Sequence, residues 1–199
     1  MRRTLYTRRV TLLIVAAALL LVPASFNATP PPAAAPAVVP LQPNIAVNGF
    51  FSADKAQRGR MIQAAIVMDI PGGYHVNANK PLGKYAIATT VKIEAPGDIK
   101  ASPVTYPRSN VRSFSFSKER LAVYEGRAVM RFNVTIPANF EPGVTELRAR
   151  VRFQSCSNDA CFPPVTRTVT MPIGIVGANE AVKRINGQIF GGGGGRRRR

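Results

Sequence analysis

Short runs in which apolar and polar residues alternate with a period of two recur along this 199-residue chain. In the clearest run, 127–136, every second residue is apolar: Ala128, Met130, Phe132, Val134 and Ile136. The same period occurs in 62–70 and 147–153. Successive side chains of a strand point to opposite faces, so such runs predict strands that lay one face on a core. The alternation therefore restricts the middle of the chain to half-buried β-strands.

Turn signals separate these runs from one another. Glycine and proline pairs occur at 71–73, 96–97 and 142–143, and both residue types favour turns. Further strands are expected at 89–94, 121–125 and 168–171, and only 179–185 offers a short helix. About seven short strands with frequent turns are typical of a sandwich. We therefore predict an all-β domain, an antiparallel β-sandwich of the immunoglobulin-like type.

The two ends of the chain differ in composition from its middle. Four arginines and an apolar run at 10–22 predict a signal peptide over 1–28, and this run is short of the roughly 20 residues that a membrane helix needs. A cleaved signal is therefore favoured over an uncleaved anchor. Residues 29–42 are rich in proline and alanine, which predicts an extended linker. We expect the globular domain at 43–176 and a flexible Gly/Arg tail at 177–199.

The formal net charge of +17 is concentrated at the two ends. Without the eight arginines of the signal and the tail, 19 basic residues stand against 10 acidic ones. An exported basic chain meets lipid or acidic proteins, so we expect no nucleic-acid partner. Arg196–Arg199 would contribute a weak contact to anionic lipid, about 1 kcal/mol per arginine near the bilayer. A solvated end with no partner is the alternative.

Cys156 and Cys161 are the two cysteines of the chain. Export permits a disulfide, which is either a structural staple or a working dithiol. A loop of six residues gains only about 2 kcal/mol from closure, less than the roughly 3 kcal/mol of a fifteen-residue loop. A purely stabilising role is thereby weakened. The single histidine, His75, leaves the cysteines one ligand short of a closed zinc site, so no metal or cofactor is expected.

Strand parity makes a prediction about the first cysteine. If 145–156 is one regular strand, Cys156 lies on its polar face with Arg148, Arg150 and Arg152. Positive charge near a thiol lowers its pKa and raises the thiolate fraction. On this hypothesis Cys156 lies outside the core of the sandwich.

Two segments of the chain carry a resemblance to a known family. Residues 153–164, Phe-Gln-Ser-Cys-Ser-Asn-Asp-Ala-Cys-Phe-Pro-Pro, resemble the cysteine segment of the N-terminal domain of the thiol:disulfide interchange protein DsbD family. Residues 71–81 resemble the same family's Gly-Tyr/Trp-His stretch, and 104–107 and 123–126 match two further landmarks in order. The similarity covers about 48–175. It implies an immunoglobulin-like fold, in agreement with the strand pattern.

The resemblance also implies a function in the bacterial periplasm. Cys156 and Cys161 would be a redox pair that relays electrons to disulfide isomerases or cytochrome c maturation factors, a protein-disulfide reductase type of electron transfer. Cys161 would form the mixed disulfide and Cys156 would resolve it. These 199 residues contain no eight-helix membrane region and no Cys-x-x-Cys domain. Thioredoxin-fold periplasmic proteins and a membrane electron carrier on separate chains are therefore the expected partners.

Other residues are expected to line the pair. The resemblance implies a phenylalanine-bearing loop that covers the cysteines, and spacing favours Phe116 over Phe114 for this cap; the alternative is that both phenylalanines simply pack at the sandwich edge. His75, between Tyr74 and Asn77, lies in a segment that approaches the pair in the family. It either handles protons near pH 6 to 7 or is a hydrogen-bonded structural residue. The alternative to the whole interpretation is a non-catalytic exported β-sandwich that binds a partner and has a structural disulfide.

Overall fold

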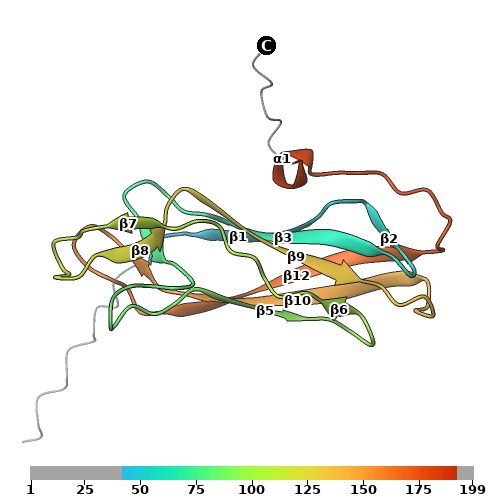
Figure 1. Ribbon diagram of the computed structural model, residues 1–199, viewed down its shortest axis with the longest axis horizontal. Coiled ribbons are helices and arrows are strands. Elements are labelled where there is room, and N and C mark those ends of the chain that lie inside the picture. The colour runs from blue at the N-terminus through green and yellow to red at the C-terminus, as the bar shows by residue number, and fades with distance from the viewer. Residues whose placement is uncertain (1–41, 192–199) are drawn as a thin grey trace, which may run out of the picture. The chain divides into compact units, whose positions relative to one another are not determined.

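The computed structural model describes residues 42–191, which form an almost entirely β structure (Figure 1). The expected signal peptide, nearly all of the expected linker and Arg196–Arg199 lie outside these residues. Between residues 42 and 191, no helix is long and apolar enough to cross a membrane. The prediction of an all-β domain is confirmed.

The strands form three four-stranded sheets, in the hydrogen-bonded orders β1-β3-β9-β6, β2-β12-β10-β5 and β11-β4-β8-β7. β2 runs parallel to β12, and the other paired strands are antiparallel. In chain order the strands are β1 (Ala46–Phe51), β2 (Lys55–Gln57), β3 (Met61–Asp69), β4 (His75–Asn77), β5 (Thr90–Glu94), β6 (Lys100–Ala101), β7 (Asn110–Arg112), β8 (Leu121–Tyr124), β9 (Arg127–Thr135), β10 (Gly143–Phe153), β11 (Ser155–Cys156) and β12 (Val165–Val176).

The sheets β1-β3-β9-β6 and β2-β12-β10-β5 have the longer strands and enclose one apolar core. Alternate residues of β9 and β10 point into it, as their period of two predicts; Met130, Val134, Leu147 and Val151 are each 0% exposed. β1 lies close to the facing sheet at Gly49, where an added Cβ would come within 2.5 Å of Met171 in β12. A side chain at this position would therefore require the Met171 side chain to move.

The third sheet, β11-β4-β8-β7, lies at one end of the sandwich, where Figure 1 shows β7 and β8. Every residue of β4 and β8 is buried, although both strands are short. Val76 and Tyr124 belong to the same apolar core as the larger sheets. The core thereby fixes the small sheet, which carries the first cysteine.

The prediction of one regular strand over 145–156 is wrong. β10 ends at Phe153, Gln154 leaves the ladder, and β11 pairs with β4 in a different sheet. After this break the alternation of inward and outward side chains no longer continues from β10. Cys156 is 0% exposed and does not lie on the exposed face of β10 that carries the arginines. The predicted effect of these arginines on the thiol loses its geometric basis.

The described part of the expected tail, 177–191, packs on the sandwich. Lys183 O accepts a hydrogen bond from Asp54 N at 3.0 Å, and Ile185 N donates to Ser52 O at 3.0 Å. The helix expected at 179–185 is instead α1 (Gly187–Phe190). Its Ile189 is 5% exposed and covers Ala65 and Val67, which face away from the main core. The packed unit therefore extends beyond residue 176.

Candidate functional site

The two cysteines close a tight hairpin at the end of β11. Their sulfurs form a disulfide of 2.03 Å, and their Cα atoms are 3.9 Å apart. Ser157 N donates to Ala160 O at 2.8 Å, and Ser157 Oγ accepts from the amides of Asp159 and Ala160 at 3.2 Å each. Serine commonly stabilises turns by such local bonds. The turn holds the two sulfurs within bonding distance.

The two halves of the disulfide differ in exposure. Cys156 is 0% exposed, whereas Cys161 is exposed, at the start of the return segment before Pro163. A thiolate arriving from solvent therefore meets Cys161 first. Attack there would release Cys156 as the leaving sulfur inside the protein.

Gln154 connects the hairpin to its surroundings. Its Oε1 accepts from Asn77 Nδ2 at 3.0 Å and from Ile87 N at 3.2 Å, and its Nε2 donates to Phe162 O at 3.1 Å. Gln154 stood in the recognised cysteine motif, but it was not among the predicted site residues. Its three bonds explain why the strand breaks beside the first cysteine.

The loop 113–120 lies over the site. Phe114 stacks on His75 with ring centroids 4.0 Å apart, and Phe116 lies 5.4 Å from Phe114 and 6.3 Å from His75. Ser115 Oγ donates to Asn158 O at 3.0 Å, which ties the loop to the cysteine hairpin. Both phenylalanines thus lie in the site, each with a different neighbour.

An open pocket of about 290 Å³ lies between this loop and the disulfide. Phe116, Cys161, Gln154, Asn77 and Tyr85 are among its lining residues. Tyr85 is 83% exposed, so the pocket presents an aromatic side chain to solvent. Phe116, rather than Phe114, shares a pocket with Cys161.

His75 lies on the buried side of the disulfide. β4 and β11 pair antiparallel with His75 directly opposite Cys156. The imidazole is 2% exposed, and burial lowers its pKa below the usual 6.5, partly offset by the carboxylate of Glu125. The other two residues of this segment also reach the site: Tyr74 lies 6.1 Å from Phe162 between ring centroids, and Asn77 contacts Gln154.

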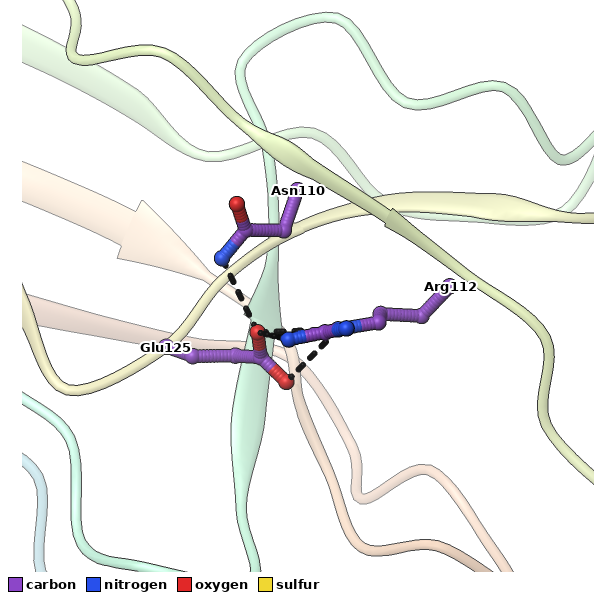
Figure 2. A network of polar contacts seen from close by, with 3 residues as sticks. All are labelled: Asn110, Arg112 and Glu125. Carbon is purple, nitrogen blue, oxygen red and sulfur yellow. Dashed lines mark hydrogen bonds and ion pairs between the residues drawn. The ribbon is translucent and has the colours of Figure 1, made fainter.

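Figure 2 shows a group of three polar side chains in contact: Asn110 and Arg112 of β7 and Glu125, which follows the end of β8. Arg112 Nη2 donates to Glu125 Oε2 at 2.9 Å, and Asn110 Nδ2 donates to the same oxygen at 2.9 Å. These contacts, with that from Arg112 the largest, lower the pKa of Glu125. Glu125 belongs to the landmark at 123–126, but sequence reasoning assigned it no place in the site.

The described range, 42–191, contains no group of three or more His, Cys, Asp or Glu side chains arranged to hold a metal ion. The chemistry that this site can perform with its own residues is that of the two sulfurs.

The comparison with protein families identifies the family of the chain. The family described as "Thiol:disulfide interchange protein DsbD, N-terminal" matches residues 42–173. The chain belongs to this family. Membership in the DsbD N-terminal family confirms the resemblance seen in the sequence and the immunoglobulin-like sandwich expected from it. The disulfide of this thiol–disulfide relay domain is Cys156–Cys161.

The comparison with solved structures finds similar N-terminal domains of two bacterial proteins. The N-terminal domain of DsbD from Neisseria meningitidis, in the reduced form, is 17% identical with a TM-score of 0.40, and the match covers 69% of this chain and 88% of that one. For the N-terminal periplasmic domain of ScsB from Proteus mirabilis, identity is 12%, the TM-score is 0.42, and coverage is 68% and 48%.

A family 123 glycoside hydrolase from Clostridium perfringens is also similar, at 13% identity and a TM-score of 0.34, over 67% of this chain and 27% of that one. None of the curated proteins compared matches the sequence.

Proposed function

We propose that this chain is a periplasmic thiol–disulfide interchange protein whose Cys156–Cys161 pair passes two electrons to the disulfides of partner proteins. The observation that carries the proposal is the difference in exposure between the two cysteine residues: Cys156 is 0% exposed and Cys161 is exposed. A relay needs one sulfur that a partner can reach and a second sulfur close enough to attack the resulting mixed disulfide. Membership in the DsbD N-terminal family supports the same reaction.

The reaction proceeds in two exchange steps. The thiolate of reduced Cys161 attacks a partner disulfide, forms a mixed disulfide, and releases one partner sulfur, which takes up a proton. Cys156 then attacks the Cys161 sulfur, forms the Cys156–Cys161 bond, and releases the second partner sulfur. The partner gains two electrons and two protons, and the domain is left oxidised.

The expected partners are thioredoxin-fold periplasmic proteins, in disulfide isomerisation or cytochrome c maturation, with a membrane electron carrier on a separate chain that reduces the domain again. The family acts with partners of the thioredoxin fold. The exposed Tyr85, which lines the same pocket as Cys161, would suit docking of such a partner. The expected signal at 1–28 supports export, and a weak lipid contact through Arg196–Arg199 remains part of the proposal.

The alternative is an exported binding module with a structural disulfide. That role predicts a pair shielded on both sides, because a staple needs no access. The exposure of Cys161 favours exchange over this alternative. The reduction potential separates the two hypotheses, since structural disulfides of secreted proteins lie below about −300 mV.

A trapping experiment tests the proposal. The full chain with Cys156→Ser is mixed with an oxidised thioredoxin-fold disulfide isomerase, and the products are separated without reductant. We expect a stable mixed disulfide through Cys161, and none with the matched control Cys161→Ser. Failure of both variants to form a mixed disulfide, together with a potential of the native pair below about −300 mV, would contradict the proposal.

A further inference from the structure

Three reactive side chains lie in one row across the small sheet. Cys156 of β11 is opposite His75 of β4, and Val76 of β4 is opposite Tyr124 of β8. Glu125 directly follows the end of β8, and continuing the register by one residue would bring it opposite His75, in agreement with the electrostatic interaction between the two side chains. Directly opposed residues of antiparallel strands point to the same face, with Cβ atoms about 4.5 to 5.5 Å apart. The row is therefore thiol, imidazole, carboxylate.

The carboxylate at one end of the row is held in place. Arg112 donates to both oxygens of Glu125, with Nε at 3.3 Å from Oε1 and Nη2 at 2.9 Å from Oε2, and Asn110 adds a third contact (Figure 2). Hydrogen bonds from cationic groups favour the charged form of a carboxylate, and the pKa of Glu125 is lowered accordingly. Glu125 therefore presents a fixed negative charge to His75.

The imidazole in the middle of the row is held in place, and one of its nitrogens is available to accept a proton. Phe114 stacks on it with an interplanar angle of 15°, and the ring is 2% exposed. Its Nε2 is buried and has no hydrogen-bond partner within the described residues. Because burial lowers its pKa, His75 is a neutral base at pH 7. The charged groups around this end of the site are Glu125, Arg112 and Asp159 of the cysteine hairpin, which line one shallow pocket with Phe114.

We propose that Cys156, His75 and Glu125 form a proton relay, in which His75 takes the proton of Cys156 as that sulfur attacks the mixed disulfide. Glu125 orients the ring and stabilises its protonated form, as the third member of nucleophile–base–carboxylate systems does. In this step the Cys156 S–H bond breaks, the Cys156–Cys161 bond forms, and the Cys161–partner bond breaks. The proton then passes from His75 to the departing thiolate or to solvent. The relay rests on the exchange reaction proposed above and assigns its second step a base.

The burial of Cys156 is the reason why the second step needs a base. A thiol with the usual pKa of about 8.5 is only about 3% ionised at pH 7, and apolar burial reduces that fraction further. Cys161 is exposed and can lose its proton to water, whereas Cys156 cannot. The relay should therefore affect resolution and leave the first attack unchanged.

A two-phase assay with the reduced full chain separates these steps. An aromatic disulfide that releases a coloured thiolate (DTNB) gives a first phase that depends on reagent concentration and a second, intramolecular phase that does not. In His75→Phe, which keeps a flat ring against Phe114, we expect the second phase to slow roughly tenfold to thirtyfold at pH 7, since a thiol of ordinary pKa is about 3% ionised there. The first phase should remain within about twofold of the native rate, because it needs no internal base.

The pH profile distinguishes a lost base from a damaged structure. The second phases of the native protein and of His75→Phe should converge above about pH 9.5, where the thiol ionises unaided. Glu125→Gln, which still accepts hydrogen bonds from Arg112 and Asn110, should slow the second phase by a smaller factor. Val134→Ala, a core change in another sheet, controls for lost stability and should leave both phases unchanged.

Two other outcomes have distinct meanings. A second phase at the native rate in both His75→Phe and His75→Gln at pH 7, or one that stays slow at every pH, overturns the relay but leaves the exchange reaction intact. Release of only one equivalent of coloured thiolate by the native protein overturns the exchange reaction and the relay together.

Discussion

The side chain of Gln154 helps to determine which sheet contains Cys156, two residues later in the chain. It bonds to Asn77, Ile87 and Phe162, three segments that meet at the site. These bonds lie directly after the end of β10 at Phe153 and allow Cys156 to enter the buried sheet. The polar residue at 154 is visible in the sequence. Its effect on strand parity is not, because that effect depends on partners up to 77 residues away in the chain.

Loss of the Gln154 side chain should loosen the hairpin. Gln154→Ala removes three hydrogen bonds and leaves part-buried partners unsatisfied, so we expect the free energy of unfolding to fall by about 1 to 3 kcal/mol. Denaturant unfolding of the oxidised protein measures it. Gln42→Ala is the matched control, because its one bond to Pro163 O is exposed, and it should change stability by less than about 0.5 kcal/mol. Equal losses in the two variants would contradict this account.

His75 should make stability depend on pH. Its pKa in the folded protein is below the unfolded value of 6.5, so the unfolded chain binds more protons between the two values. This contribution to stability is complete above pH 6.5 and decreases as the pH falls below it. Glu125, whose pKa is also lowered, acts in the same direction below its ordinary value of 4.5. Unfolding measured from pH 7.5 down to about pH 5 therefore isolates the histidine.

The control for this titration is His75→Phe, which should show a flatter dependence over the same range. A native stability that rises as the pH falls through 6.5 would have the wrong sign and would refute the lowered pKa.

At the scale of elements, short alternating runs predicted the strands well because burial on one face is a local pattern. β9 and β10 bury the residues that the period of two selects. α1 was missed because four residues carry little periodic signal. Ala65 and Val67 lie on the second face of β3, and their apolar character indicates that another segment covers this face. In the structure they are buried under Ile189. Only the folded chain shows which segment covers them.

The loop 113–120 is an element whose two aromatic residues should have separable effects. Phe116 lines the pocket beside Cys161, whereas Phe114 stacks on His75. Phe116→Ala should therefore let dithiothreitol reduce Cys156–Cys161 severalfold faster, because attack on a disulfide depends on access to the sulfur. The rate of reduction followed by thiol titration measures it. Phe114→Ala serves as the comparison, and an effect at least as large in that variant would assign the cap to Phe114 instead.

At the scale of the whole molecule, the disulfide is a small part of what holds the domain together. The two cysteines are only five positions apart in the sequence, whereas the apolar core contains residues of all three sheets. The double variant Cys156→Ser, Cys161→Ser should lose only about 2 kcal/mol of unfolding free energy, as expected for so short a loop. Thermal and denaturant unfolding of native oxidised, native reduced and variant proteins test this.

Reduction should therefore leave the sandwich folded, which a relay requires because it works in both redox states. Global unfolding of the reduced protein at room temperature would favour a structural staple instead.

The sequence by itself determined the longest strands, many of the turns, the family and the pair of cysteines, because periodicity, turn residues and motif spacing are local properties of the chain. The tertiary structure decided which cysteine is buried, since Gln154 transfers Cys156 to another sheet through contacts with distant segments. It also placed Cys156 opposite His75 and brought the end of β8, which Glu125 follows, beside the same strand, so that segments far apart in the sequence meet there. Residues so far apart in the sequence become neighbours only when their strands pair, so the sequence alone does not reveal the arrangement.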